Sequence, residues 1–214
     1  MAYGFLDIAR TPSVKAAQAA NGVGAFWDQF KGHRQSNRFT AAEMEFIAAR
    51  DSFYLATVSE TGWPYLQHRG GPVGFLRVID DTTLAFADFR GNRQYISLGN
   101  VAANDRVALF LMDYPNRRRL KIYARIEVKN LTVDPALTEK LALPGYKAKP
   151  ERVFVLHLEA FDWNCSQHIM PRFTEEEIDA ALSPVRARIA QLEAENKTLR
   201  EKLSSAAEAQ NAEH

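Results

Sequence analysis

Seven short segments between residues 53 and 161 are rich in β-branched and aromatic residues, and turn signals such as Asp80-Asp81 separate them. Residues of these kinds fit the pleated, half-buried surface of a sheet, so each segment predicts a β-strand. The predicted strands cover residues 53–58, 64–69, 73–79, 83–88, 106–113, 119–128 and 152–161. Because few helical segments interrupt them, we expect a mainly β (α+β) fold.

Two of the predicted strands constrain the architecture further. In the segment 119–128, apolar residues alternate with charged or polar ones, as in an antiparallel strand with one buried face. The run from Val107 to Met112 is apolar at every position, so both of its faces must be covered. A barrel wall that also forms a subunit interface would cover both. We therefore expect a closed or nearly closed β-barrel that forms a homodimer.

Helices are predicted at the periphery of this barrel. Thr40 and Glu43 have the spacing of a capping box at the start of an apolar segment, which predicts a helix over residues 40–50. Two short helices are predicted between strands, over residues 92–99 and 135–141.

The sharpest periodic pattern lies near the C-terminus. Apolar residues and one asparagine recur there at alternating spacings of four and three: Val185, Ile189, Leu192, Asn196, Leu199 and Leu203. Leucine at heptad position d with a single asparagine at position a favours a parallel two-stranded coiled coil. The alternative is an amphipathic helix packed against its own barrel. Ser183-Pro184 has the pattern of an N-cap followed by proline, so we expect the helix to begin there.

Composition and charge exclude several classes of function. Lys and Arg total 27 against 26 Asp and Glu, so no general electrostatic field draws the protein to nucleic acid or to a membrane. The apolar runs are too short to span a bilayer and the N-terminus lacks a signal-peptide pattern, so we expect a cytoplasmic protein. Cys165 is the single cysteine, and no HExxH motif occurs, so neither a disulfide framework nor a metal site is expected.

A candidate anion site follows the predicted strand 83–88. There the chain passes through Gly91 into a predicted helix start, which would place backbone N–H groups and the positive helix end beside Arg90 and Arg93. His68-Arg69 lies at the end of a neighbouring predicted strand. Together these features predict a phosphate site, although each arginine alone could equally be a solvated surface charge.

Three motifs in this order resemble a known family, the flavin-nucleotide-binding proteins related to pyridoxamine 5′-phosphate oxidase. They are Gly62-Trp63-Pro64-Tyr65-Leu66-Gln67-His68-Arg69-Gly70-Gly71, Asp88-Phe89-Arg90-Gly91-Asn92-Arg93 and Phe161-Asp162-Trp163-Asn164-Cys165-Ser166-Gln167-His168-Ile169. The resemblance covers roughly residues 40–173. It implies an FMN-binding split β-barrel, with two FMN sites at the interface of a homodimer.

The resemblance also implies roles for individual residues. Asn92 and Arg93 match a Ser and an Arg that hold the flavin phosphate, and residues 86–88 match the strand beneath the isoalloxazine ring. Arg119 stands where the oxidases carry a glutamine that contacts the ring, and Trp163 matches a tryptophan near the flavin. The full predicted cofactor-binding set is His68, Arg69, Phe86, Ala87, Asp88, Arg90, Asn92, Arg93, Arg119, Trp163, Gln167 and His168.

Departures from the oxidase pattern argue against pyridoxamine 5′-phosphate oxidase activity itself. His68 replaces a phosphate-binding arginine, whereas Val73 and Gln94 replace lysines. Residues 134–150 lack the set that holds pyridoxal phosphate, and the segment after Trp163 lacks the terminal Arg-Leu-His-Asp-Arg of the oxidases. Phosphate affinity must then come from other donors, for which Arg69 and Arg90 are the candidates.

Several readings of the function stay open at this point. The first is an FMN-dependent oxidoreductase with a small-molecule electron donor such as NADH or NADPH; no catalytic residue is assigned, although His68 and His168 could transfer protons. The second is a flavin-binding protein without turnover, and the third a haem- or deazaflavin-binding relative. The predicted organisation is an N-terminal extension (1–39), the split-barrel flavin-binding domain (40–173), a helical coiled-coil segment (174–203) and a frayed tail (204–214).

Overall fold

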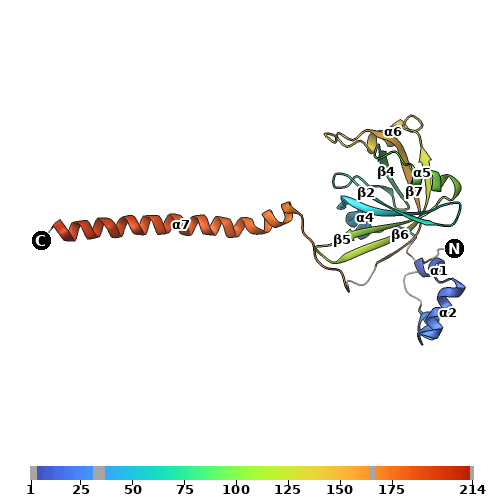
Figure 1. Ribbon diagram of the computed structural model, residues 1–214, viewed down its shortest axis with the longest axis horizontal. Coiled ribbons are helices and arrows are strands. Elements are labelled where there is room, and N and C mark those ends of the chain that lie inside the picture. Colours follow the sequence, from blue (N-terminus) through green and yellow to red (C-terminus); the bar gives the residue numbers. More distant parts are fainter. Residues whose placement is uncertain (1–3, 31–36, 164–166, 213–214) are drawn as a thin grey trace. The chain divides into compact units, whose positions relative to one another are not determined.

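The computed structural model describes residues 4–30, 37–163 and 167–212 (Figure 1). The chain forms two compact units, Met1–Met170 and Pro171–His214. Asn164, Cys165 and Ser166, which belong to the third motif, lie outside the described residues.

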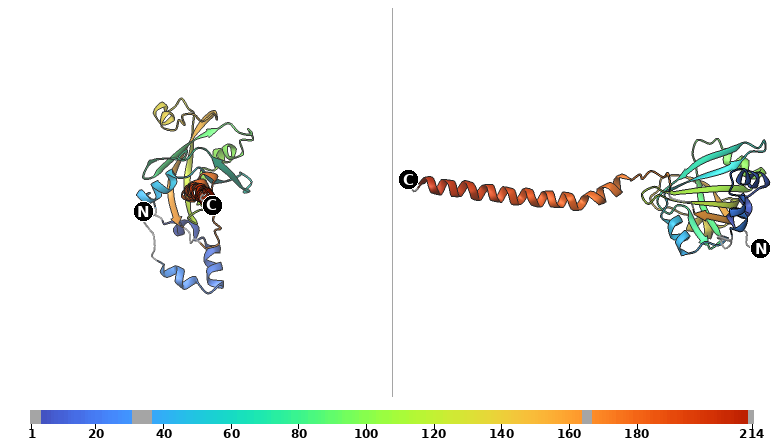
Figure 2. Two further views of the ribbon diagram at one scale, coloured as in Figure 1. Left: turned by 90° about the vertical axis from the view of Figure 1, so that its left-hand side faces the viewer. Right: turned by 90° about the horizontal axis from the view of Figure 1, so that it is seen from below.

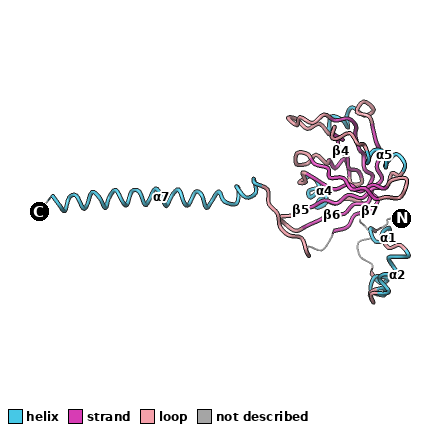
Figure 3. The backbone as a smooth tube through the Cα atoms, in the orientation of Figure 1, coloured by secondary structure: helices cyan, strands magenta, loops and turns pink. Residues whose placement is uncertain are grey.

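The first unit is built on one seven-stranded sheet with the order β2-β1-β5-β6-β7-β4-β3 (Figures 1 and 3). Every pair of neighbouring strands in this sheet is antiparallel. The strands are β1 (Ser52–Val58), β2 (Pro64–Gly70), β3 (Arg77–Asp80), β4 (Thr83–Phe89), β5 (Arg106–Asp113), β6 (Arg118–Lys129) and β7 (Pro150–Trp163). The order leaves β2 and β3 at the two edges, so the sheet curves into a split barrel rather than a barrel closed by hydrogen bonds among the described strands. The predicted α+β fold is confirmed.

Seven helices accompany the strands in the described residues. They are α1 (Phe5–Ala9), α2 (Pro12–Ala20), α3 (Gly24–Gln29), α4 (Ala41–Ala48), α5 (Ile96–Ala103), α6 (Pro135–Lys140) and α7 (Glu175–Ala212). The first three, which the sequence analysis did not predict, gather beside one side of the sheet (Figure 2). The predicted capping box is confirmed, because the backbone N–H of Thr40 donates to Oε2 of Glu43 over 2.9 Å at the start of α4.

The core explains why the strands occupy these positions. On β6, Leu120, Ile122 and Ala124 are almost fully buried, as the alternating pattern predicts. They pack with Phe53, Leu55, Leu109 and Leu111 of the neighbouring strands in one large cluster. A smaller cluster of Ala85, Leu141, Val153 and Val155 lies on the other side of the β4–β7 pair, beside α6.

Several predicted boundaries are wrong. The segment 73–79 forms a strand only from Arg77, and the helix predicted over 92–99 begins at Ile96, so a loop separates it from β4. The C-terminal helix begins at Glu175 and contains Pro184. Its start is set by Thr174, whose Oγ1 accepts from the N–H of Glu177 over 3.2 Å while its own N–H donates to the Glu177 carboxylate over 2.8 Å. This reciprocal cap outcompetes Ser183-Pro184.

The helix α7 also continues through Ala212, past the boundary predicted at residue 203. Along the described parts of the chain, no helix combines the length and the apolar character that a membrane crossing requires.

A buried hydrogen bond fixes α5 against the sheet. The Nδ2 of Asn100 donates to Oγ1 of Thr57 on β1 over 2.9 Å, and both residues are buried. Because this amide has left water, the bond replaces hydration that it lost on folding.

We predict that Thr57→Val lowers the free energy of unfolding by about 1–3 kcal/mol, because it leaves the buried Asn100 amide without its acceptor. Urea denaturation measures the difference. The control is Val58→Thr on the exposed neighbouring position, which should change stability by less than about 0.5 kcal/mol. Equal effects of the two substitutions would contradict the importance of this bond.

Candidate functional site

A cavity of about 160 Å³ lies between β2, the end of β4 and the start of α5. Tyr65, Gln67 and Arg69 of β2 line it from one side, and residues 91–98 line it from the other. Asp88 of β4 and Glu151 of β7 complete the wall. We call it the anion cavity.

The loop between β4 and α5 has an unusual backbone. Arg93 and Tyr95 have positive φ values of 61° and 53°, a region that side chains with a Cβ rarely occupy. Asn92 stabilises the turn, since its Oδ1 accepts from the N–H of Gln94 over 3.1 Å. Left-handed residues of this kind cost on the order of 1 kcal/mol each and concentrate at functional sites.

The start of α5 faces the cavity with unused donors. Its N-cap, Tyr95, provides no side-chain cap among the described residues, so the first backbone N–H groups of the helix have no side-chain acceptor there. Ser97 in the first turn lines the cavity and is only 3% exposed. Its Oγ is buried without a hydrogen-bond partner in the described part of the chain. A buried hydroxyl without a partner is unfavourable unless a ligand completes it.

Opposite Ser97, Arg69 is held by a buried carboxylate. Its Nη1 lies 2.5 Å from Oδ1 of Asp88, and Nη1 of Arg152 lies 2.5 Å from the other oxygen of the same carboxylate. Asp88 is 6% exposed, so the two guanidinium groups compensate a charge that has left water. The Nε of Arg69 is buried and, among the residues described, lacks a partner. Asp88 thus fixes Arg69 and leaves one of its donors unused.

Glu151 extends this network to the mouth of the cavity. It accepts from Nε of Arg90 over 3.1 Å and from the Tyr95 hydroxyl over 3.2 Å, and it pairs with Arg152. Desolvation opposes ionisation of Glu151, but the hydrogen bonds from Tyr95 and Arg90 and the charge of Arg152 lower its pKa. Likewise, burial disfavours the charge of Arg152, yet the hydrogen bond and charge of Asp88 raise its pKa. Both shifts favour the charged forms of Glu151 and Arg152.

The balance of these charges is positive. Arg69, Arg90 and Arg152 face two carboxylates, those of Asp88 and Glu151, which leaves one positive charge in excess. Arg93 lines the same cavity and adds a second. Together with the start of α5 and the open donors, this excess makes the cavity suited to a phosphoryl group.

The structure brings together four of the twelve residues predicted for the cofactor site, because Arg69, Asp88, Asn92 and Arg93 all line the anion cavity. Arg90 lies at its edge through the ion pair with Glu151. The side chain of Phe86 instead belongs to the core, and Ala87 lines a separate apolar cavity.

The remaining predicted residues lie elsewhere. His68 points to the opposite face of β2, where its ring lies edge-on to that of Tyr54, with the ring centroids 5.6 Å apart. Arg119 lies beside Phe110, and its Nε is buried without a partner in the described residues. Gln167 and His168 occupy an exposed turn.

Trp163 lies at the end of β7 and packs inside its own chain. Its ring packs edge-on against that of Phe46, with the ring centroids 4.7 Å apart, and its Nε1 donates to Oε1 of Glu43 over 2.6 Å. Desolvation opposes ionisation of Glu43, but the hydrogen bonds from Thr40 and Trp163 lower its pKa. The indole nitrogen is therefore already used within α4 and β7.

Ser97, Glu151 and Arg152 were not among the site residues predicted from the sequence. The sequence did contain a signal that β2 lines the site, because Tyr65, Gln67 and Arg69 are every second residue of one strand and must share a face. No comparable signal exists for Arg152, because its role depends on the pairing of β7 with β4 opposite Asp88.

Another apolar cavity, of about 480 Å³, lies on the outer face of the sheet. It is lined by Phe5, Tyr54, Ala56, Leu66, Phe110 and Tyr123, among others. Phe5 of α1 stacks on Tyr123 with ring centroids 4.4 Å apart, and Leu66 remains 62% exposed. We call this surface the outer apolar face. The sequence predicts that both faces of the segment 107–112 are covered. In a single chain the outer face is only partly covered.

Comparisons with known proteins place these features in context. The family model described as pyridoxamine 5′-phosphate oxidase matches residues 39–161. No sequence among the curated proteins matches the chain.

The chain is also similar to several solved structures. One is the HupZ protein of Group A Streptococcus, with 17% sequence identity and a TM-score of 0.48 over 63% of this chain and 100% of that chain. Another is an FMN-binding protein from Syntrophomonas wolfei, with 14% identity and a TM-score of 0.46 over 69% of this chain and 97% of that one. A third is an FAD-binding protein from Mesorhizobium loti, with 17% identity and a TM-score of 0.43 over 58% and 94%.

We predict that Asp88→Asn lowers the free energy of unfolding by roughly 3–5 kcal/mol, because the half-buried Arg69 loses its counter-charge and Arg152 keeps only that of Glu151. Chemical denaturation at neutral pH measures this loss. Asp105→Asn is the matched control: Asp105 also pairs with an arginine, Arg125, but both side chains are nearly half exposed, so the expected loss is at most about 1 kcal/mol. A loss at position 88 no greater than at position 105 would refute this account of the network.

Proposed function

The chain belongs to the pyridoxamine 5′-phosphate oxidase family, and on this premise we propose that it binds a flavin nucleotide, FMN, with the phosphate in the anion cavity. All the residues that line this cavity fall within the matched residues 39–161. The observation that carries the proposal is the pair of buried donors, Ser97 Oγ and Arg69 Nε, that no group in the described chain satisfies.

Phosphate oxygens suit these donors. A phosphate accepts several hydrogen bonds at once, and its charge is favoured both by the start of a helix and by an excess of arginine. Arg93, Arg69 and Ser97 would hold it, and Asp88 would keep Arg69 in place. The left-handed residues of the 90–95 loop shape the wall before any ligand arrives, so the site is preorganised.

The size of the cavity supports a role for a second subunit. At about 160 Å³ it is smaller than the roughly 300–1,000 Å³ of typical ligand sites, so it accommodates the phosphate but not the ring system. We propose that the protein is a homodimer in which the partner encloses the rest of the nucleotide. The outer apolar face, with Leu66 exposed, supports such an interface because surfaces of this kind mark contact sites.

The proposed activity is that of an FMN-dependent oxidoreductase. When bound, the flavin accepts and donates hydride equivalents, and the chain's contribution is to bind and orient it and to exclude water. Arg119, whose buried Nε has no partner among the described residues, is proposed to contact the ring end of the nucleotide. The domain that performs this function is proposed to span residues 40–173, with 1–39 as an extension.

The cofactor and its turnover are tested on the purified protein. Two flavin absorption bands, and FMN released on denaturation, support the proposal, whereas a haem Soret band or a deazaflavin band would replace it. Anaerobic mixing with NADH or NADPH then separates an oxidoreductase from a flavin-storage protein. Bleaching of the flavin within seconds requires hydride transfer, and an unchanged spectrum with a series of small reduced donors would reject the catalytic part.

We predict that Ser97→Ala weakens FMN binding by roughly 10- to 100-fold, since a hydrogen bond to a charged group contributes about 1.5–3 kcal/mol. The unfolding free energy of the apoprotein should not fall, because the Ser97 hydroxyl has no partner among the described residues. Fluorescence titration of apoprotein with FMN measures the affinity. Unchanged affinity would reject the assignment of the cavity.

Arg93→Ala should lose flavin while the protein remains a dimer, because Arg93 lines the cavity from the surface and is exposed. Arg106→Ala is its control, because Arg106 is an exposed arginine at the start of β5, outside the lining of the cavity. Flavin content after gel filtration distinguishes the two variants. Full flavin occupancy in Arg93→Ala would contradict the phosphate site.

A further inference from the structure

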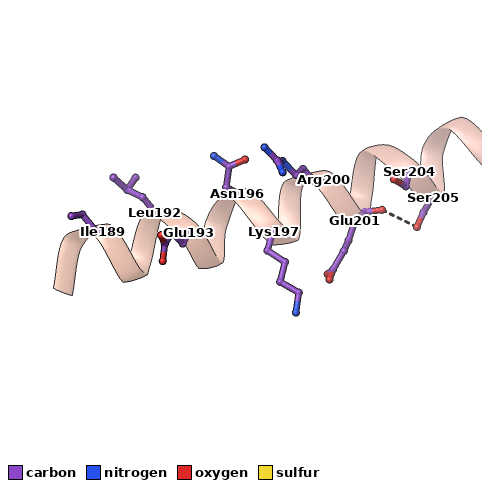
Figure 4. Close-up of a pocket in the computed structure, with 9 residues that line it drawn as sticks. All are labelled: Ile189, Leu192, Glu193, Asn196, Lys197, Arg200, Glu201, Ser204 and Ser205. Atoms are coloured by element: carbon purple, nitrogen blue, oxygen red, sulfur yellow. Dashed lines mark hydrogen bonds between the residues drawn. The ribbon is translucent and has the colours of Figure 1, made fainter. Parts of the chain in front are cut away.

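The helix α7 exposes apolar side chains along its length. Seven large aliphatic residues are each 41–70% exposed: Ile178, Leu182, Val185, Ile189, Leu192, Leu199 and Leu203. Figure 4 shows Ile189, Leu192 and Asn196 projecting from the same side of the helix, with Lys197 and Glu201 on the opposite side. An aliphatic stripe of this length is unfavourable in water, so it calls for a partner.

The positions of these residues follow one heptad repeat. Ile178, Val185, Leu192 and Leu199 occupy position d, whereas Leu182, Ile189, Asn196 and Leu203 occupy position a. The repeat therefore includes two further residues, Ile178 and Leu182, which lie on the N-terminal side of Pro184 and were not part of the predicted heptad pattern. This extension is possible because α7 begins at Glu175.

We propose that α7 pairs with α7 of a second copy of this chain as a parallel, in-register, two-stranded coiled coil centred on Val185–Leu203. This inference concerns the second unit, residues 171–214, and does not depend on flavin binding. Two further observations, the flanking charges and Asn196, select the partner and the orientation.

The charges beside the stripe are complementary between two parallel copies. In such a pair, a residue at position g meets the residue at position e of the next heptad in the partner. Arg188 then meets the partner's Glu193, and Glu195 meets the partner's Arg200. Each of these pairs occurs twice by symmetry, and all have opposite charges. A second copy of this helix therefore has the charges that complement those beside the stripe.

Asn196 decides between parallel and antiparallel pairing. An antiparallel arrangement with equally many apolar layers also brings opposite charges together, but it places Asn196 against the partner's Val185. The asparagine amide would then be buried without a hydrogen-bond partner. In the parallel register Asn196 meets the same residue of the partner, and the two amides can bond to each other.

Pro184 is compatible with this arrangement. It falls at position c, which points away from the stripe. A proline inside a helix removes one backbone hydrogen bond and bends the axis, and at an exposed position water can satisfy the carbonyl that it leaves free. The coiled coil would therefore be regular from Val185 onward, with Leu182 and Ile178 extending the stripe beyond the bend.

Parallel pairing has a consequence for the first unit. It brings residue 171 of both copies to the same end of the coiled coil, so two 1–170 units are tethered together and their effective concentration rises. On the premise of the proposed function, a flavin site built from two chains would then form at lower protein concentration.

The orientation is tested by cross-linking of the full-length chain with Cys165→Ser and Leu199→Cys. Under oxidised glutathione, two thiols at position 199 lose two protons and two electrons to the oxidant and form one disulfide. Parallel pairing places the two positions within disulfide reach, so a nearly complete covalent dimer is expected. Ala187→Cys at the outward position f is the matched control and should remain monomeric in denaturing electrophoresis.

Antiparallel pairing would bring position 199 against position 182 of the partner. Efficient cross-linking only in the double variant Leu182→Cys/Leu199→Cys would therefore overturn the proposed orientation. Absence of cross-linking in every variant would overturn the coiled coil itself.

Association is tested separately by sedimentation velocity. We expect Leu192→Glu to raise the dimer dissociation constant about tenfold or more, because it places two like charges in the apolar seam. Lys197→Glu on the opposite side is the control and should leave the dissociation constant within about twofold, since exposed charges contribute little. An unchanged dissociation constant in Leu192→Glu would contradict the proposal. Neither readout uses the flavin, so failure of the flavin assignment would not affect this result.

Asn196→Leu tests the role of the asparagine. We expect a higher melting temperature of the helical signal in circular dichroism, because the apolar seam becomes continuous, and a loss of the exclusive parallel register. In that background Leu199→Cys alone should cross-link less completely than with Asn196 present. Unchanged cross-linking would show that the orientation has another origin.

Discussion

The carboxylate of Asp88 between the guanidinium groups of Arg69 and Arg152 is the interaction on which the candidate site depends. It joins β2, at one edge of the sheet, to β4 and β7, which lie near the other edge. A buried charge is tolerated only when it is compensated, so the three residues constrain one another's positions. As a result Arg69 is held beside the anion cavity, with its buried Nε lacking a partner among the described residues.

The rest of the site likewise combines a constrained backbone with a buried hydroxyl that has no hydrogen-bond partner among the described residues. The loop before α5 adopts left-handed conformations at Arg93 and Tyr95, and Ser97 buries a hydroxyl that no described group satisfies. Each feature is unfavourable for folding alone. Together they form a wall of positive charge and open donors that a phosphoryl group would complete, which is why we connect them with a nucleotide.

Both units of the chain leave apolar surface uncovered, and in each case a second copy is the proposed cover. The outer apolar face of the sheet exposes Leu66, and between Ile178 and Leu203 the stripe on α7 exposes aliphatic residues at every a and d position except Asn196. Two separate contacts would make the dimer more stable than either alone, because the first to form raises the local concentration for the second. The N-terminal helices contribute to the outer face through Phe5, whose stacking on Tyr123 the sequence did not predict.

Local patterns in the sequence determined the strands, the capping box of α4 and the heptad stripe of α7, because each depends on residues a few positions apart. The motif 88–93 likewise indicated Arg93. The tertiary structure alone decided that Arg152 shares Asp88 with Arg69, that Trp163 is bound to Glu43, and that Ser97 is buried at the cavity. Those contacts join residues that are far apart in the chain or depend on where a helix packs, and only strand pairing and burial bring them together.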